Sequence, residues 1–122
     1  MRPYVEIAQL RELLLEVSYV LGITAIPGKV TFELDLVLTP GHGEYSPPGP
    51  GQQYCSRRGL LVFEGVTRLL WSQAGNPPAV DASGEADYGQ IDSFEWDDAG
   101  ALLEGSWGRM EIVSSSIEVA LQ

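Results

Sequence analysis

The alternation of apolar and polar residues constrains the fold of this chain more than any other feature of its sequence. Along residues 30–38, one face is apolar and the other carries Thr31, Glu33 and Asp35. The apolar face consists of Val30, Phe32, Leu34, Leu36 and Leu38. Successive side chains of an extended strand point to opposite faces, so this spacing buries one face and leaves the other in water. Similar patterns recur almost to the last residue, and they predict an all-β, antiparallel fold.

The distribution of these patterns predicts about seven strands. Alternation from Leu13 to Ile23 favours a strand over a helix, and a short N-terminal helix or an edge strand before it is left open. Gly65 interrupts the third segment and indicates a bulge or bend. The expected β segments are residues 12–26, 29–38, 58–73, 94–96, 102–107, 109–112 and 117–121.

Burial of one face of each strand requires two layers, which predicts a β-sandwich or a partly open barrel. The chain has 122 residues, of which 44% are hydrophobic, and this is enough for one core. We therefore expect a single β domain over residues 1–122. Its first and last strands are the expected sheet edges, where pairing with a second copy would give a homodimer.

Two long loops separate the strands. Residues 39–54 contain eight glycines and prolines in sixteen positions, and neither residue type supports a β ladder. Residues 79–90 form an acidic loop that also contains glycine. Long loops in compact domains are often functional, but an insertion tolerated at the end of a sheet is an equally good interpretation of residues 39–54.

The net charge of −10, from seventeen carboxylates and seven cations, disfavours nucleic acids and anionic membranes as partners. This charge either maintains solubility or forms an acidic face for a basic partner. The chain has one cysteine, no recognisable signal peptide and no apolar run of the roughly 18–20 residues that span a bilayer. We therefore expect a soluble, cytoplasmic protein.

Residues that could carry catalysis do not form a recognisable motif. His42 lies in the first loop and Cys55 directly follows it, and the two would make a dyad only if the fold joined them. No nucleophile elbow and no phosphate-binding loop is present. We therefore expect a protein that is not an enzyme and that needs no cofactor.

The acidic stretch after residue 80 resembles a calcium loop only weakly. Oxygen ligands recur at alternate positions, but the sixth position is Ala86, where an EF-hand needs glycine. The twelfth position is an aspartate in place of the bidentate glutamate. The weak metal-ligand candidates are Asp81, Glu85, Asp87 and Asp92.

The aromatic residues fall into two groups. Trp71, Trp96 and Trp107 are predicted to lie in strands and to belong to the core. Tyrosines in or beside the two loops suit contacts with a protein or a sugar, although they would also cover the edge of a core. The candidate binding residues are Tyr45, Tyr54, Asp87, Tyr88 and Asp92.

These patterns favour a small binding or accessory protein that contacts a protein partner through an acidic surface and the loops 39–54 and 79–92. Its most specific form is an immunity-type or inhibitor protein that neutralises a basic partner. The alternatives are a small-ligand carrier with an aromatic-lined mouth, and a calcium- or carbohydrate-binding module.

Overall fold

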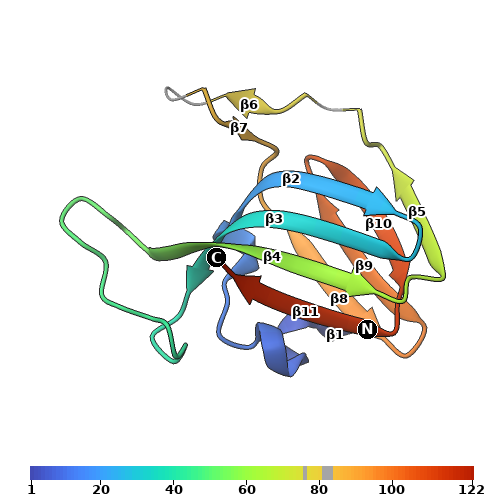
Figure 1. Ribbon diagram of the computed structural model, residues 1–122, viewed down its shortest axis with the longest axis horizontal. Coiled ribbons are helices and arrows are strands. Elements are labelled where there is room, and N and C mark those ends of the chain that lie inside the picture. Colours follow the sequence, from blue (N-terminus) through green and yellow to red (C-terminus); the bar gives the residue numbers. More distant parts are fainter. Residues whose placement is uncertain (76, 81–83) are drawn as a thin grey trace.

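The computed structural model describes residues 1–75, 77–80 and 84–122, which form two packed antiparallel sheets (Figure 1). One sheet has the order β1-β8-β9-β10-β5, with bounds Arg2–Pro3, Ser93–Asp97, Gly100–Gly105, Gly108–Val113 and Arg68–Ser72. The other has the order β11-β4-β3-β2, with bounds Ser116–Leu121, Cys55–Glu64, Lys29–Leu38 and Tyr19–Ile26. Both sheets have open edges. The prediction of an antiparallel β-sandwich is confirmed, and a closed barrel is not formed.

The core lies between the two sheets, where their apolar faces meet. β3 pairs with β4 along its whole length, and Phe32, Leu34 and Leu36 on its inner face are fully buried. Aromatic rings link the layers, because Phe32 contacts Trp107 at a centroid distance of 5.3 Å and Phe63 contacts Phe94 at 6.0 Å. The alternation along residues 30–38 therefore faces the core as predicted, and leaves Glu33 and Asp35 on the outer face.

The prediction of one strand over residues 12–26 is wrong over residues 12–18, nearly half of its length. Three short 3₁₀ helices, η1 (Tyr4–Glu6), η2 (Ala8–Leu10) and η3 (Leu15–Val17), precede β2, which begins only at Tyr19. Leu10, Leu13 and Leu15 are all buried, so these residues reach the core from turns. The alternation in this segment reflects burial and does not reflect an extended backbone.

The inner face of β2 also differs from the one that the alternation from Leu13 to Ile23 predicts, which would bury Tyr19 and Ile23 and leave Val20 on the outer face. Val20 is fully buried whereas Tyr19 is 44% exposed. A register shift between Val20 and Gly22 inserts one extra residue in β2 relative to β3. Such a bulge exchanges the faces on its two sides, because side-chain direction has a period of two. Ile23, beyond the bulge, packs against the core as predicted.

The third predicted segment, residues 58–73, is two strands in different sheets. β4 ends at Glu64 and β5 begins at Arg68, and the chain crosses from one sheet to the other between them. Gly65 lies in the connection with a φ of 63°. The interruption at Gly65 is confirmed, but it ends a strand instead of bending one. This division gives eight strands of five or more residues in the described parts of the chain, one more than expected.

The C-terminal strands follow the predicted order of turns. β8, β9 and β10 form a meander of antiparallel hairpins, and β11 then crosses to pair with β4. β11 and β2 are the outer strands of their sheet, as predicted for the last and first strands. The second loop contains a small ladder between β6 (Ala79–Val80) and β7 (Ala86–Asp87).

Of the three tryptophans predicted to belong to the core, only Trp107 is fully buried. Trp107 is 2% exposed, but it lies in the turn between β9 and β10. Trp96 is partly buried against the core. The prediction is wrong for Trp71, which is 37% exposed because β5 is an edge strand. No helix in the described residues is long and apolar enough to cross a membrane.

Candidate functional site

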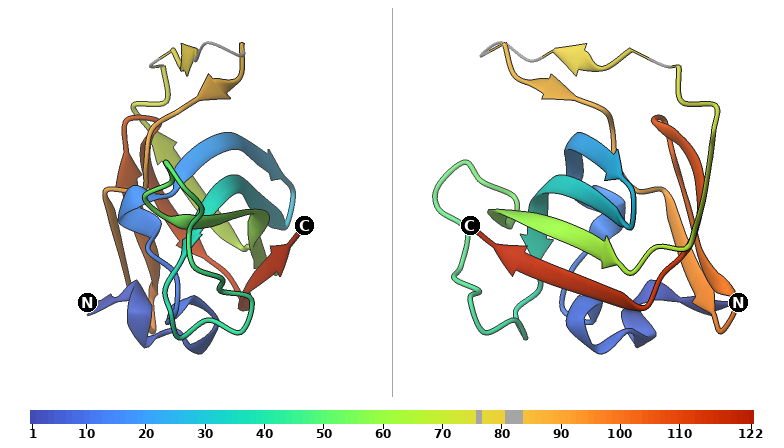
Figure 2. Two further views of the ribbon diagram at one scale, coloured as in Figure 1. Left: turned by 90° about the vertical axis from the view of Figure 1, so that its left-hand side faces the viewer. Right: turned by 45° about the vertical axis from the view of Figure 1, so that its right-hand side comes forward.

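Loop 39–54 and the last residue of the second loop, Gln90, border a hollow of about 500 Å³ at one end of the sandwich. Loop 39–54 projects from the end of the sheets at the left of Figure 1 and of the right-hand view in Figure 2, and residues 88–90 end the second loop beside β2. We call this cavity the loop hollow and define it by Tyr19, Asp35, Gln53, Tyr54, Ser56 and Gln90. These residues come from three strands and both loops, so the cavity depends on the tertiary fold.

A row of residues across the outer face of the four-stranded sheet forms the floor of the loop hollow. Tyr19 lies opposite Asp35, and Asp35 lies opposite Arg58 on β4. On the other side, Gln90 extends the row through an isolated antiparallel bridge with Tyr19. Residues opposed in this way share a face, with Cβ atoms about 4.5–5.5 Å apart. The row therefore places an aromatic ring directly beside a carboxylate.

Backbone hydrogen bonds attach the second loop to the edge of β2. The Tyr88 N–H donates to the Val20 carbonyl at 2.8 Å, and the Val20 N–H donates to the Gly89 carbonyl at 2.7 Å. The Asp87 carboxylate accepts from the Gly89 N–H at 2.6 Å, which stabilises the turn that follows β7. Together these bonds position Gln90 at the rim of the hollow.

Loop 39–54 provides the wall of the hollow. Its proline and glycine residues prevent pairing with a neighbouring strand, so the chain turns back on itself. The Gln52 side chain accepts a hydrogen bond from the Gly49 N–H at 3.0 Å, which closes the last turn. An ion pair of 3.5 Å between Glu44 and Arg57 ties the loop to β4. Tyr54, directly after this turn, is 39% exposed.

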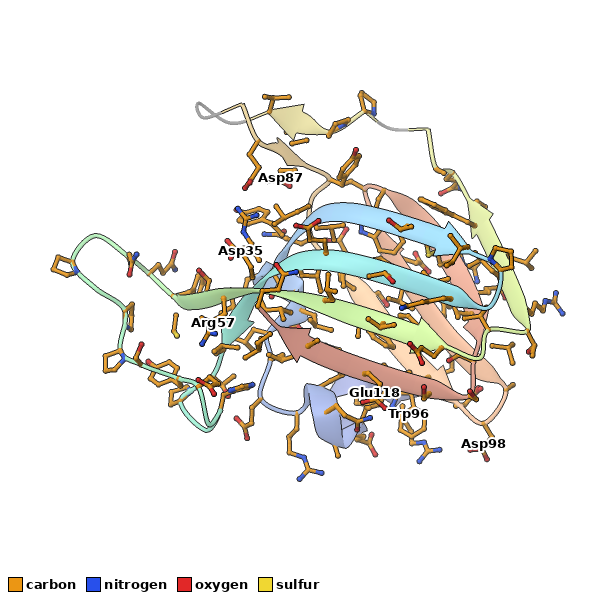
Figure 3. The ribbon with its side chains drawn as sticks, in the orientation of Figure 1. Asp35, Arg57, Asp87, Trp96, Asp98 and Glu118 are labelled. Carbon is orange, nitrogen blue, oxygen red and sulfur yellow. The ribbon has the colours of Figure 1, made fainter. Side chains whose placement is uncertain are left out.

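Carboxylates outnumber cations beside the hollow. Arg58 donates to both oxygens of Glu85 at 2.7 Å, so its guanidinium is turned toward the second loop. The hydrogen bonds to Glu85, together with the charges of Glu85, Asp35 and Glu33, raise the pKa of Arg58. In the described part of the chain, neither Asp35 nor Glu33 forms an ion pair. Figure 3 shows Asp35 at this end of the sheets, below Asp87.

A smaller aromatic pocket lies between the edges of β2 and β5. It has a volume of about 130 Å³ and is lined by Ile23, Trp71, Ala74, Tyr88 and Trp107. The indole N–H of Trp71 donates to the Trp107 carbonyl, and that of Trp107 donates to the Gln90 carbonyl. Both indole donors are therefore used within the protein, and the rings offer the pocket only their apolar surface.

A third hollow, of about 510 Å³, lies near the N-terminal turns and the Ser114–Ser116 connection. Several polar groups in and beside it are paired within the chain. Arg2 contacts Asp98 at 3.4 Å, the Gln9 amide donates to the Ile117 carbonyl, and the Ser115 hydroxyl donates to the Glu64 carbonyl. In the loop hollow, no hydrogen bond within the described residues involves the side chains of Asp35, Gln53 or Gln90. These three side chains are therefore available to a ligand.

The structure separates the residues proposed as binding groups. Tyr54 lines the loop hollow, and Tyr88 lines the aromatic pocket. Tyr45 packs against the core, which agrees with the alternative in which a loop tyrosine covers the edge of a core. Asp87 stabilises a turn, and Asp92 is exposed at the start of β8. Sequence reasoning missed Tyr19, Asp35 and Gln90, because only the register of the strands brings them together.

The other proposed chemistry finds little geometric support. The His42 ring accepts a hydrogen bond from the Glu44 N–H at 3.0 Å, and no bond in the described residues joins it to Cys55. Asp81 lies outside the described residues. Glu85 pairs with Arg58, and the described residues include no group of three potential metal ligands.

No protein-family model, curated protein or solved structure matches this chain. The geometry of the loop hollow and the charge around it are therefore the features that bear on function.

Proposed function

We propose that this protein is a non-catalytic binding module that docks a basic protein partner on the loop hollow and the acidic surface beside it. One observation carries the proposal. Both long loops and the outer face of β2–β4 contribute to a single cavity, with carboxylates in excess around it. An immunity-type or inhibitor protein of the cytoplasm is the most specific form of this proposal.

Two physical properties of the surface support a protein partner. Tyrosine is enriched among the residues that contribute most to interfaces, and Tyr19 and Tyr54 are 44% and 39% exposed. The net charge of −10 attracts a basic partner over long distances and accelerates its association. Tyrosines would then supply the short-range contacts, while the carboxylates supply steering and orientation.

Paired charge-neutralised variants test this proposal. The variant Glu33→Gln/Asp35→Asn removes two charges beside the hollow. The variant Glu95→Gln/Glu111→Gln removes two exposed charges from the outer face of the other sheet, so both proteins have the same net charge. Each is used to capture partners from the host lysate at low and high salt, with identification by mass spectrometry.

We expect one basic protein to be captured by the wild type and by the Glu95/Glu111 variant, released by salt, and lost with the Glu33/Asp35 variant. Equal loss with both variants would show that only the overall charge matters. Retention by both would show that the partner uses another surface. Either result would contradict the proposal.

The aromatic pocket supports a second candidate, a carrier of small apolar ligands. Its lining of Trp71, Tyr88 and Trp107 matches the expected aromatic mouth. Its volume of about 130 Å³ is below the roughly 300–1,000 Å³ of most ligand pockets. This function predicts a change in tryptophan fluorescence with ligands the size of one aromatic ring, and no such change with a protein that binds the loop hollow.

Self-association through a sheet edge is a further proposal, because β5 exposes Leu70 and Trp71 at an open edge. Sedimentation velocity at increasing protein concentration tests it. A concentration-dependent dimer that is lost with Leu70→Lys would support edge pairing, and a monomer at all concentrations would contradict it.

A further inference from the structure

We infer that the loop hollow receives the guanidinium group of an arginine side chain of the partner. This inference rests on the proposed function and adds the chemical identity of the group that anchors the complex. Three features of the hollow support it: a carboxylate at the floor, two exposed aromatic rings, and uncommitted amide groups at the rim.

The carboxylate of Asp35 is placed to receive a cation. It lies on the outer face of β3, between Tyr19 and Arg58 in the row across the sheet. Arg58 does not neutralise it by direct contact, because the guanidinium of Arg58 binds both oxygens of Glu85 at 2.7 Å. The single positive charge of Arg58 thus faces three carboxylates, those of Glu85, Asp35 and Glu33. The surface therefore has negative charge left for a cation from outside.

At the opposite end of the sandwich, an arginine of the chain itself is held between an aromatic ring and a carboxylate. The guanidinium of Arg2 lies over the Trp96 ring, 4.0 Å from its centroid, and contacts the Asp98 carboxylate at 3.4 Å. Figure 3 labels Trp96 and Asp98 there. An aromatic face and a carboxylate that hold one guanidinium are a stable combination, because both groups favour a weakly hydrated planar cation.

The loop hollow has the same two kinds of group without the cation. Tyr19 is directly opposite Asp35, and the half-exposed ring of Tyr54 lines the same cavity. The inferred arginine would occupy the place beside Asp35 that Arg2 occupies beside Asp98.

The rim of the hollow favours arginine over lysine. A guanidinium presents five N–H donors in one plane, whereas an ammonium is a compact point charge. Asp35 supplies two acceptor oxygens, and the side chains of Gln53, Gln90 and Ser56 supply further acceptors around the same cavity. The volume of about 500 Å³ exceeds that of one side chain, so part of the partner backbone would enter with the arginine.

An NMR titration with three matched peptides tests the inference. The probes are acetyl-Gly-Arg-Gly-amide, its lysine analogue and its citrulline analogue, which keeps the shape of arginine but lacks the charge. Shifts of backbone amides are followed in the ¹⁵N-labelled wild-type protein. We expect the arginine peptide to shift Tyr19, Asp35, Tyr54 and Gln90 in a saturable manner. The citrulline peptide should bind at least about tenfold more weakly, because it cannot pair with the carboxylate.

Three variants identify the groups responsible. Asp35→Asn removes the carboxylate with little change of shape, and Tyr54→Leu removes an aromatic ring at an exposed position. Both should weaken binding of the arginine peptide by about fivefold or more, since each removes one of the two recognition groups. Glu111→Gln, on the outer face of the other sheet, changes the net charge equally and should leave binding unchanged. The dispersed amide spectrum of each variant verifies that it is folded.

Several outcomes would overturn the inference. Equal affinity for the arginine and citrulline peptides would show that no cation is recognised. Equal affinity for arginine and lysine, unchanged by Tyr54→Leu, would show that the acidic surface attracts any cation. That result would remove the arginine site and leave the proposed docking function intact. Failure of all three peptides to shift these residues would also overturn it. The same holds if the neutral sugar maltotriose shifts them and none of the peptides does, because the hollow would then bind a sugar.

The capture experiment with the Glu33/Asp35 variant tests docking without reference to arginine. Loss of salt-sensitive capture by that variant, together with a negative peptide titration, would refute the arginine site alone. Retained capture by that variant would refute the docking surface itself.

Discussion

At the scale of single residues, the hydroxyl group of Tyr4 organises the turns that precede β2. Tyr4 is 7% exposed, and its hydroxyl accepts a hydrogen bond of 3.1 Å from the Leu15 N–H. The same oxygen lies 3.1 Å from the Leu13 carbonyl and contacts the Glu16 carboxylate. One side chain therefore satisfies polar groups in a buried segment that β3 reaches only through a single bridge, between Leu13 and Leu38.

Replacement of Tyr4 by phenylalanine should destabilise the protein by about 1–3 kcal/mol. The variant keeps the ring in the core but leaves buried backbone groups without a partner, and such groups carry a desolvation penalty of this size. Urea unfolding followed by tryptophan fluorescence measures the change. Tyr19→Phe is the matched control, because Tyr19 is 44% exposed, and a surface change of this kind alters stability by less than about 0.5 kcal/mol. Equal effects of both substitutions would contradict this role of Tyr4.

The stability that Tyr4 confers should disappear at high pH. Burial, followed by the hydrogen bond with Glu16, raises the pKa of Tyr4 above its ordinary value of about 10. The folded protein then retains the proton at a pH where the unfolded chain has lost it. The contribution is fully present below about pH 10 and is lost as the pH rises through the folded pKa, by up to about 1.4 kcal/mol per pH unit. Stability differences between wild type and Tyr4→Phe at pH 9–11.5 test this. Parallel curves would contradict it.

At the scale of secondary-structure elements, short connections decide which sheet a strand joins. The chain leaves the four-stranded sheet after β4, returns to it at β11, and changes layer at Gly65 and near Ser115. These two connections lie against each other, since the Ser115 N–H donates to the Glu64 carbonyl at 3.0 Å. The packing of two turns thus links both layers of the sandwich.

Gly65→Ala should therefore destabilise the protein by about 1–3 kcal/mol. Gly65 has a φ of 63°, which alanine adopts only with strain, and a Cβ atom there would collide with the Ser115 side chain. Thermal unfolding by circular dichroism measures the loss. Gly43→Ala in the first loop is the control, because nothing lies within 4 Å of its Cβ position and its φ is not positive. A neutral Gly65→Ala variant would show that the connection is free to move.

Elements whose conformation follows from the pattern of neighbouring residues in the sequence were predictable. Elements whose conformation depends on contacts with residues distant in the sequence were not. Alternation identified residues 29–38 because β3 buries one face and pairs on both sides. It failed over residues 12–18, where the hydroxyl of Tyr4 and the buried Ser18 satisfy the backbone in turns. The Ser18 hydroxyl accepts from the Val37 N–H at 3.0 Å, a contact that only the folded chain creates. The loop hollow follows the same rule, because loop composition indicated Tyr54 whereas strand register assembled its neighbours.

At the scale of the whole molecule, charge repulsion opposes folding while it favours a basic partner. Seventeen carboxylates and seven cations give a net charge of −10. All five ion pairs recorded in the described residues involve well-exposed side chains, and such pairs contribute at most about 1 kcal/mol each. We therefore expect repulsion among the excess carboxylates to lower stability by more than these pairs raise it.

Salt should consequently raise the thermal unfolding midpoint. Between about 20 and 300 mM NaCl the screening length falls from about 20 Å to below 10 Å, which weakens repulsion across the molecule. Differential scanning fluorimetry at neutral pH measures the midpoint, and sodium sulfate at equal ionic strength separates screening from specific ion effects. A midpoint that falls with salt would show that the ion pairs dominate.

The docking proposal and the arginine site depend on one structural claim, that loop 39–54 and Gln90 of the second loop border a single hollow. Paramagnetic relaxation enhancement tests this claim most directly. A nitroxide is attached at Gln53→Cys in a chain whose natural thiol is removed by Cys55→Ala, and amide signals are compared with those of the reduced label. A label at this position should strongly broaden the amide signals of Tyr19 and Gln90, and broaden little that of Asp98 on the β8–β9 turn. Broadening confined to loop 39–54, with Tyr19 and Gln90 unaffected, would contradict it.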